Sequence, residues 1–252
     1  MLEPKVIELL QDLFAAGSNH DIEKNILIRT KLVNFMTDNN LFLKDQNKNF
    51  IMIKDAIRFI DAHTILATTT NQNEAGICLK PFFRRLYVIL PENWNYYELK
   101  FLIGSLHLVE DIKQALRLGY KSLTVVSKFE NAENKGVFES AIICNVCNRI
   151  LYAKYFDNTV NDKINLTLEF DSWFEKLENM PKKDSEIEFH FLLTKIKKAL
   201  FFQNRQLVGE LLGELQTEYD EKIFDVVNKE VITYYTQFKK EVNANVHLQS
   251  FN

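Results

Sequence analysis

The first side chains whose spacing suggests chemistry are Cys144 and Cys147, which frame the sequence Cys-Asn-Val-Cys. A structural zinc site needs four ligands, usually supplied by two such cysteine pairs on turns. The chain has three cysteines and no second pair, and Cys144 and Cys147 lie inside the apolar stretch 141–150. Residues three apart share a face of a helix. We therefore interpret both cysteines as small buried hydrophobic residues, and we expect no metal site and no other cofactor.

A second pattern, in the segment 137–156, predicts a helix with two unlike faces. The first face is apolar and consists of Ile143, Val146, Cys147 and Ile150. The second face carries Phe138, Ala141, Asn145, Asn148, Arg149 and Tyr152. Asparagine is a poor helix former, because its side chain competes for backbone hydrogen bonds. Two asparagines in the middle of one helix therefore need a physical reason.

The amide-rich second face fits the backbone of an extended peptide. An amide side chain offers both a donor and an acceptor, which match the N–H and C=O groups that an extended peptide leaves unsatisfied. Asn145 and Asn148 would hold the peptide backbone, and Arg149 would hold an acidic side chain or a terminal carboxylate. Aromatic residues such as Tyr152 would fill alternate pockets. The alternative is a solvated face, in a protein whose AT-rich coding supplies asparagine freely.

Two further groups are candidates for the same peptide site. Arg84 and Arg85 are adjacent in a chain that is poor in arginine, which indicates a site for an acidic ligand or an interface. A solvated pair is the alternative. Phe101 belongs to the wide apolar surface of the helix that follows Trp94, and we predict that it contacts the peptide.

The elements that must position these side chains are expected to be helices. The chain has seven Gly and four Pro, where average usage would give about eighteen and about thirteen in this length. Tight turns and phosphate-binding loops are therefore few, which favours long helices over sandwiches, Rossmann folds and P-loop enzymes. Apolar periodicity predicts helices over 2–15, 19–38, 52–68, 95–109, 111–129, 137–156, 166–180, 185–203, 204–217 and 220–242. The apolar stretch 78–90 could be a helix or a strand by its pattern alone, and its neighbours favour a helix.

Several helix boundaries can be read from single residues. Asn95 with Glu98, and Ser185 with Glu188, have the spacing of a capping box, and Asp111 can cap the helix that follows it. The stretch 69–76 is the most loop-like part of the chain.

The spacing of the predicted helices indicates the fold class. Successive helices start roughly 17–30 residues apart, in the range of tetratricopeptide-like (TPR-like) and HEAT-like arrays. We therefore predict an all-α fold, an irregular α-solenoid of TPR-like helical hairpins, as a single domain over 1–252. A compact all-α bundle is the alternative.

Composition and missing motifs narrow the function. The 31 Lys+Arg against 34 Asp+Glu argue against a general nucleic-acid binder, which needs a basic excess on at least one face. The sequence has no glycine-rich phosphate loop, nucleophile elbow or His-Glu-x-x-His motif, so we do not expect an enzyme. The odd cysteine count, with neither a signal peptide nor an apolar run of about 18 residues, predicts a cytoplasmic protein without a membrane partner.

The segment Tyr87-Val-Ile-Leu-Pro-Glu-Asn-Trp94-Asn-Tyr-Tyr97-Glu-Leu99 and the apolar helix after it resemble a segment of the Rgg/GadR/MutR family of bacterial transcriptional regulators. The helices 137–156, 166–179 and 195–203 follow in similar order. The specific part of the resemblance is about twenty residues long, within an overall similarity over roughly 1–240. Residues 1–65 differ from the family, because they lack its helix-turn-helix signature and an arginine-rich recognition helix.

The resemblance implies a regulatory domain for quorum sensing. Family members bind a short secreted signalling peptide, re-imported into the cell, on the concave face of a TPR-like array, and they are typically homodimers. DNA binding would require a helix-turn-helix domain, which this chain does not show. That domain was either removed from the chain or is naturally absent. We therefore expect a peptide-sensing regulatory domain. The first alternative is a stand-alone helical-repeat adaptor that binds a protein partner. The second alternative is an enzyme, which a bound metal or a pocket with converging carboxylates would favour.

Overall fold

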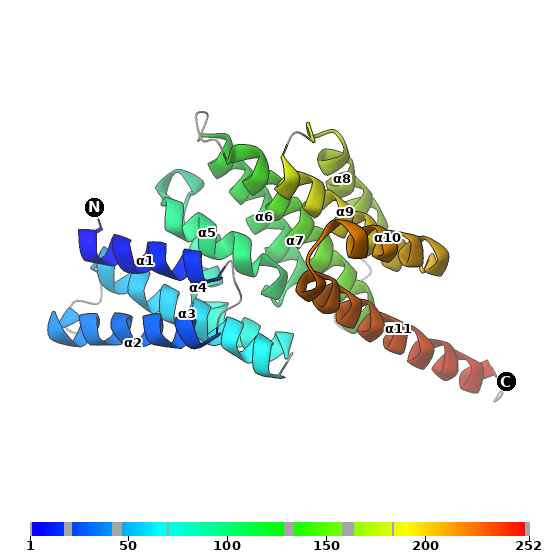
Figure 1. Cartoon of the computed structure of the whole chain (residues 1–252), viewed down its shortest axis with the longest axis horizontal. Coiled ribbons are helices and arrows are strands. Elements are labelled where there is room, and N and C mark those ends of the chain that lie inside the picture. Colours follow the sequence, from blue (N-terminus) through cyan, green and yellow to red (C-terminus); the bar gives the residue numbers. More distant parts are fainter. Residues whose placement is uncertain are drawn as a thin grey trace. The chain divides into compact units, whose positions relative to one another are not determined.

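The computed structural model describes residues 2–17, 22–41, 47–69, 71–128, 134–157, 164–182 and 184–249, with the side chains of 16–17 and 239–249 excepted. Helices account for nearly all of these residues, and no strand occurs among them (Figure 1). The all-α prediction is confirmed. The described chain divides into two compact units, Met1–Lys128 and Phe129–Asn252. We call them the N-terminal and C-terminal units.

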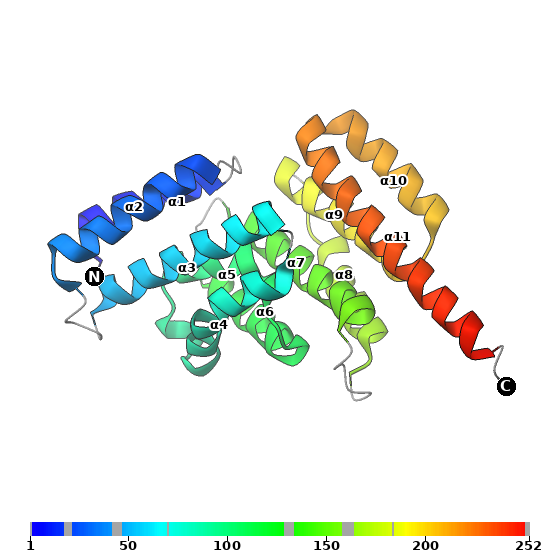
Figure 2. The ribbon, with the colours of Figure 1, turned by 90° about the horizontal axis from the view of Figure 1, so that it is seen from below.

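The N-terminal unit is built from six α-helices and two 3₁₀ turns in its described residues. They are α1 (Pro4–Gly17), α2 (Ile22–Asp38), α3 (Lys48–Thr69), α4 (Gln72–Val88), η2 (Pro91–Asn93), α5 (Tyr96–Ser105), η3 (Leu106–Leu108) and α6 (Ile112–Ser127). Each of the first three helices packs against the next along the chain, as Figure 2 shows for α1, α2 and α3. Helices α5 and α6 pack on α3 and α4 and on each other.

The C-terminal unit has five helices in its described residues, and three of the other four pack on α7. They are α7 (Lys135–Phe156), α8 (Leu166–Glu178), α9 (Ser185–Phe201), α10 (Arg205–Glu218) and α11 (Glu221–Gln249). Helix α7 packs against α8, α9 and α11. Helix α10 packs against α9 and α11 (Figure 2).

Local capping signals fix most of the helix starts. Asn95 accepts hydrogen bonds from the backbone of Tyr97 and Glu98, and Glu98 accepts one from the backbone of Asn95, so the predicted capping box is confirmed. Asp111 caps α6 as predicted, by accepting from the Gln114 N–H.

Two boundary predictions are wrong. Helix α9 is capped by Asp184, which accepts from the Glu186 N–H, so Ser185 is its first helical residue and not its cap. A carboxylate one residue earlier provides the same acceptor and adds charge next to the positive helix end. Most of the stretch predicted as a loop, 72–76, is the first turn of α4, because Asn71 caps it through the Glu74 N–H.

Two helical glycines in unlike surroundings give a matched stability test. A Cβ on Gly76 in α4 would lie 2.5 Å from the backbone oxygen of Leu108, whereas a Cβ on Gly209 in α10 would meet nothing within 4 Å. Alanine is better than glycine in a helix by about 1 kcal/mol. We expect Gly209→Ala to raise the free energy of unfolding by about 0.5–1 kcal/mol, and Gly76→Ala to lower it despite the better helix propensity. Urea unfolding followed by circular dichroism measures both; a stabilised Gly76→Ala would contradict the close backbone contact.

A search of the described helices for a segment of sufficient length and apolarity to cross a membrane finds none.

Candidate functional site

Helix α7 is buried on most of its circumference. The residues of α7 that are buried are Ser140, Ala141, Ile142, Ile143, Cys144, Val146, Cys147, Arg149, Ile150, Leu151, Ala153 and Tyr155. A helix that is apolar nearly all round belongs inside a helical layer, which explains why α8, α9 and α11 all pack on it. The two-faced helix predicted from the sequence is therefore apolar over a wider arc than expected.

A stripe of partly exposed side chains remains on this central helix. Phe138, Asn145, Asn148 and Tyr152 are all half-buried, and their spacing of three, four or seven residues places them on one side of α7. We call these four residues the amide face. Ala141, which was predicted with them, is buried.

Asn148 is the polar centre of the amide face. Its side-chain oxygen Oδ1 is buried, and no hydrogen-bond donor reaches it from the described part of the chain. A buried acceptor without a partner costs about 1–3 kcal/mol, and asparagine is also a poor residue for a helix interior. Asn148 is therefore a costly residue for the fold of the described helices alone.

Aromatic rings flank one end of the amide face. The Tyr152 ring stacks on Phe156 with centroids 5.0 Å apart, and Phe156 meets Tyr234 of α11 at 5.3 Å. Burial raises the pKa of Tyr152. The sequence analysis missed Tyr234, because it lies about eighty residues from the amide face along the chain and only the packing of α11 on α7 brings it there.

Arg149 has a structural partner of its own. Its side chain is 3% exposed, and Nη2 donates to Asp157 Oδ2 at 3.0 Å. The guanidinium also lies 5.5 Å from the centre of the Tyr152 ring. The prediction that Arg149 is a surface residue presented to a ligand carboxylate is wrong, because Asp157 and the surrounding core already hold it.

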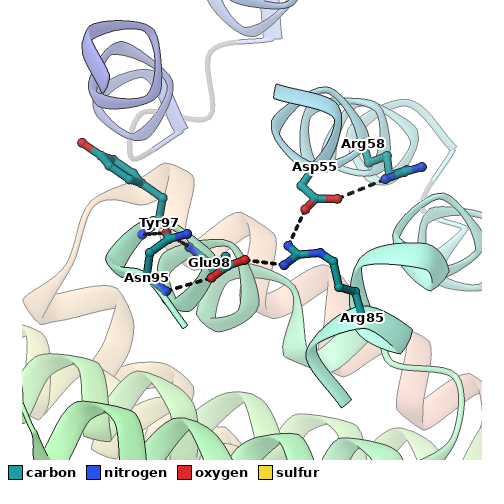
Figure 3. A network of polar contacts seen from close by, with 6 residues as sticks. All are labelled: Asp55, Arg58, Arg85, Asn95, Tyr97 and Glu98. Carbon is teal, nitrogen blue, oxygen red and sulfur yellow. Dashed lines mark hydrogen bonds and ion pairs between the residues drawn. The ribbon is translucent and has the colours of Figure 1, made fainter. Parts of the chain in front are cut away.

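The other three predicted site residues belong to the N-terminal unit. Arg85 donates to Asp55 Oδ2 at 2.5 Å and also pairs with Glu98, whose carboxylate completes the capping box of α5 (Figure 3). Arg84, one residue earlier, is exposed. The two arginines differ because adjacent helical residues point about 100° apart, so only one of them faces α3 and α5.

Phe101 is a core residue. It is fully buried, and its ring lies 5.1 Å from Phe14, 5.2 Å from Phe59 and 6.3 Å from Phe82. The prediction that Phe101 contacts a peptide is corrected, because three other helices cover its ring.

The Asp55 network in Figure 3 is the feature that sequence reasoning missed. Asp55 is 2% exposed and is held between Arg58, at 3.0 Å, and Arg85. Burial raises the pKa of Asp55, against the opposing effect of Arg85 and Arg58. A sequence signal existed: Asp55 shares its helical face with Met52 and Phe59, and a charge at an apolar position needs a partner.

The cysteine pair is buried, as predicted: Cys144 is 3% and Cys147 0% exposed. Burial raises the pKa of the Cys147 thiol far above its ordinary value. Lys197 Nζ of α9 donates to Cys144 Sγ at 3.3 Å. Among the described residues, no group of three or more His, Cys, Asp and Glu side chains is arranged to hold a metal ion.

His190 beside α7 predicts a pH dependence. Its Nδ1 lies 2.9 Å from Ser140 Oγ, and burial, followed by the charge of Lys197, lowers the pKa of His190 to about 4 from 6.5. The unfolded chain therefore binds more protons than the folded chain between these values, so stability is lost as the pH falls through this window. We expect a loss of about 2 kcal/mol between pH 7 and pH 5.

Chemical denaturation at the two pH values tests this dependence. A His190→Gln variant removes the titrating group and should lose clearly less stability than the wild type over the same interval. Equal losses in both proteins would show that other groups carry the pH dependence.

The amide face thus combines two side-chain amides with the aromatic rings of Phe138 and Tyr152. Comparison of the chain with protein-family models, with curated proteins and with solved structures finds no match.

Proposed function

We propose that this protein is a cytoplasmic peptide-sensing regulator, of the kind found in the Rgg/GadR/MutR family, and that a short extended peptide binds along the amide face of α7. The carrying observation is Asn148, whose buried Oδ1 lacks a donor among the described residues. The resemblance of the segment around Trp94 to the family supports the same function.

The dimensions of the amide face suit a short stretch of extended chain. From Asn145 to Tyr152 the helix rises by about 10 Å, at 1.5 Å per residue. An extended peptide covers that length in about three residues. Asn145 and Asn148 would each exchange hydrogen bonds with one peptide unit, and Tyr152 with Phe156 would receive an apolar side chain of the peptide.

The regulatory consequence in this proposal is a change of state in a TPR-like array. Peptide binding would favour one arrangement of α7 and its neighbours α9 and α11 over another, by its difference in affinity for the two. A homodimer would carry that change to its partner copy, and a helix-turn-helix domain elsewhere would convert it into a change in transcription.

A binding assay with one substitution tests the proposal. A panel of fluorescent apolar octapeptides is titrated with the wild type, with Asn148→Ala, and with Asn179→Ala, an exposed asparagine at the end of α8 that serves as control. We expect Asn148→Ala to weaken the best peptide about tenfold, since a peptide hydrogen bond of about 1.4 kcal/mol is lost. Its stability should stay equal or rise, because an unsatisfied buried acceptor is removed.

The control and the contrary results are distinct. Asn179→Ala should leave peptide affinity unchanged. If no peptide of the panel binds the wild type, or if Asn148→Ala binds as well as the wild type, peptide recognition by the amide face is refuted.

A second function, a helical-repeat adaptor for a protein partner, is favoured by the exposed apolar side chains of α4. Ile77 is 63% and Val88 79% exposed, eleven residues apart and therefore on one side of the helix. Replacing both with Ser should abolish capture of such a partner without affecting peptide binding.

A further inference from the structure

A second candidate site lies within the N-terminal unit. A pocket of about 370 Å³ opens between α3 and α4. Its polar wall is formed by Lys54, Asp55, Arg58 and Arg85, and its apolar wall includes Phe50 and Pro81. The volume is within the range of small-molecule sites, and the combination of an apolar wall with a few convergent charges is typical of them.

The charges of this pocket do not cancel. Asp55 neutralises one arginine, and Glu98 pairs with Arg85 from outside the pocket wall. Three cations, Lys54, Arg58 and Arg85, therefore meet two carboxylates, which leaves one positive charge.

Two cations of the pocket wall, Lys54 and Arg58, also have hydrogen-bond donors that no described contact uses. Arg58 has five N–H donors, of which Asp55 takes one in the described contacts. The Lys54 ammonium lies 4.9 Å from the centre of the Phe50 ring, at the junction of the charged and apolar walls. Asp55 cannot turn to a ligand, because it is 2% exposed and each of its oxygens is already bonded to an arginine.

We propose that the pocket between α3 and α4 binds a small carboxylic acid with an apolar body. The carboxylate would accept from Lys54 and Arg58, and the apolar part would lie against Phe50 and Pro81. A monoanion balances the single excess charge, whereas the second charge of a phosphate monoester would stay uncompensated beside the buried Asp55. The source of the carboxylate is either a free small acid or the C-terminus of a peptide.

Ligand-observed fluorine NMR with 4-fluorobenzoate tests the proposal on the full chain. We expect saturable binding of 4-fluorobenzoate and none of the neutral 4-fluorobenzamide at the same concentrations. Lys54→Gln should weaken binding about tenfold, and Lys54→Arg should restore it, because the positive charge returns. Arg84→Gln makes the same change of charge at an exposed position next to Arg85 and should bind within about twofold of the wild type. Lys54 makes no ion pair in the described contacts, so its replacement should leave the fold intact.

The outcomes separate the alternatives. Equal binding of the benzamide, or unchanged affinity in Lys54→Gln, would overturn the proposal, as would absence of binding at millimolar 4-fluorobenzoate. Displacement by inorganic phosphate at lower concentration than by benzoate would overturn the choice of a carboxylate. A peptide that ends in phenylalanine is compared with benzoate as a competitor of 4-fluorobenzoate. If the peptide displaces 4-fluorobenzoate at a lower concentration than benzoate does, and if amidation of its C-terminus abolishes this displacement, the source of the carboxylate is a peptide C-terminus. Failure of the peptide panel on the amide face leaves this test unaffected, because 4-fluorobenzoate reports on the pocket alone.

Discussion

Replacing Phe101 with alanine is expected to lower the free energy of unfolding by about 3–5 kcal/mol. Phe101 is fully buried, and rings from three helices, Phe14 of α1, Phe59 of α3 and Phe82 of α4, surround it. The substitution removes the transfer free energy of a whole ring and leaves a cavity that these neighbours cannot close. A loss of this size is a large part of the stability of an ordinary domain.

Urea unfolding measures this effect, and Phe101→Leu provides the control. Leucine fills most of the volume, so its cost should be about 1–1.5 kcal/mol. A Phe101→Ala protein within 1 kcal/mol of the wild type would show that Phe101 faces an accessible surface and would revive its predicted role as a peptide contact.

Replacing Arg149 with alanine is the second change with a large expected effect, again about 3–5 kcal/mol. Removal of one partner leaves Asp157, which is only 14% exposed, as a carboxylate without its cation. The buried guanidinium stem also fills space beside the Tyr152 ring, so packing is lost together with charge.

A double substitution separates the two contributions. Arg149→Met with Asp157→Leu replaces the ion pair by apolar groups and should recover most of the stability, since well-packed apolar pairs are often as stable as buried ion pairs. If Arg149→Ala leaves stability unchanged but abolishes peptide binding, the residue is a ligand contact and the structural assignment is wrong.

The local features of the fold could be predicted from the sequence, because their causes are local. Asn95 with Glu98, and Asp111, show their capping function within four residues, and the apolar periodicity places most helices within a few residues of their bounds. The same reasoning failed at Ser185, where an equally good acceptor, Asp184, lay one position earlier.

The environment of each side chain could not be predicted in the same way. A helical wheel gives the angle of Arg149 and Phe101 around their helices, but it does not give the number of neighbours that cover each angle. Helix α7 is covered by three helices, so Arg149, which was predicted on the second face, is buried. The pocket at Asp55 depends on Arg85, thirty residues later, and such pairing arises only when α3 and α4 pack.

The two amides of α7 could be singled out from the sequence, because asparagine is unusual in mid-helix. Their role as peptide contacts stays a prediction. Within the stretch 140–151 of α7, Asn145 and Asn148 are the two residues that are not buried. Of the two, Asn148 has a buried Oδ1 that no hydrogen-bond donor reaches from the described part of the chain.

Photo-crosslinking from the amide face tests the central claim most directly. A p-benzoylphenylalanine at Phe138 replaces one aromatic ring with another on the same side of α7, and the same group at Leu168, which is 66% exposed on α8, serves as control. With the tightest peptide of the panel, we expect a covalent adduct from position 138, mapped to the peptide by mass spectrometry, and none from position 168. An adduct from position 168 alone, or equal adducts from both positions, would contradict the assignment of the amide face as the peptide site.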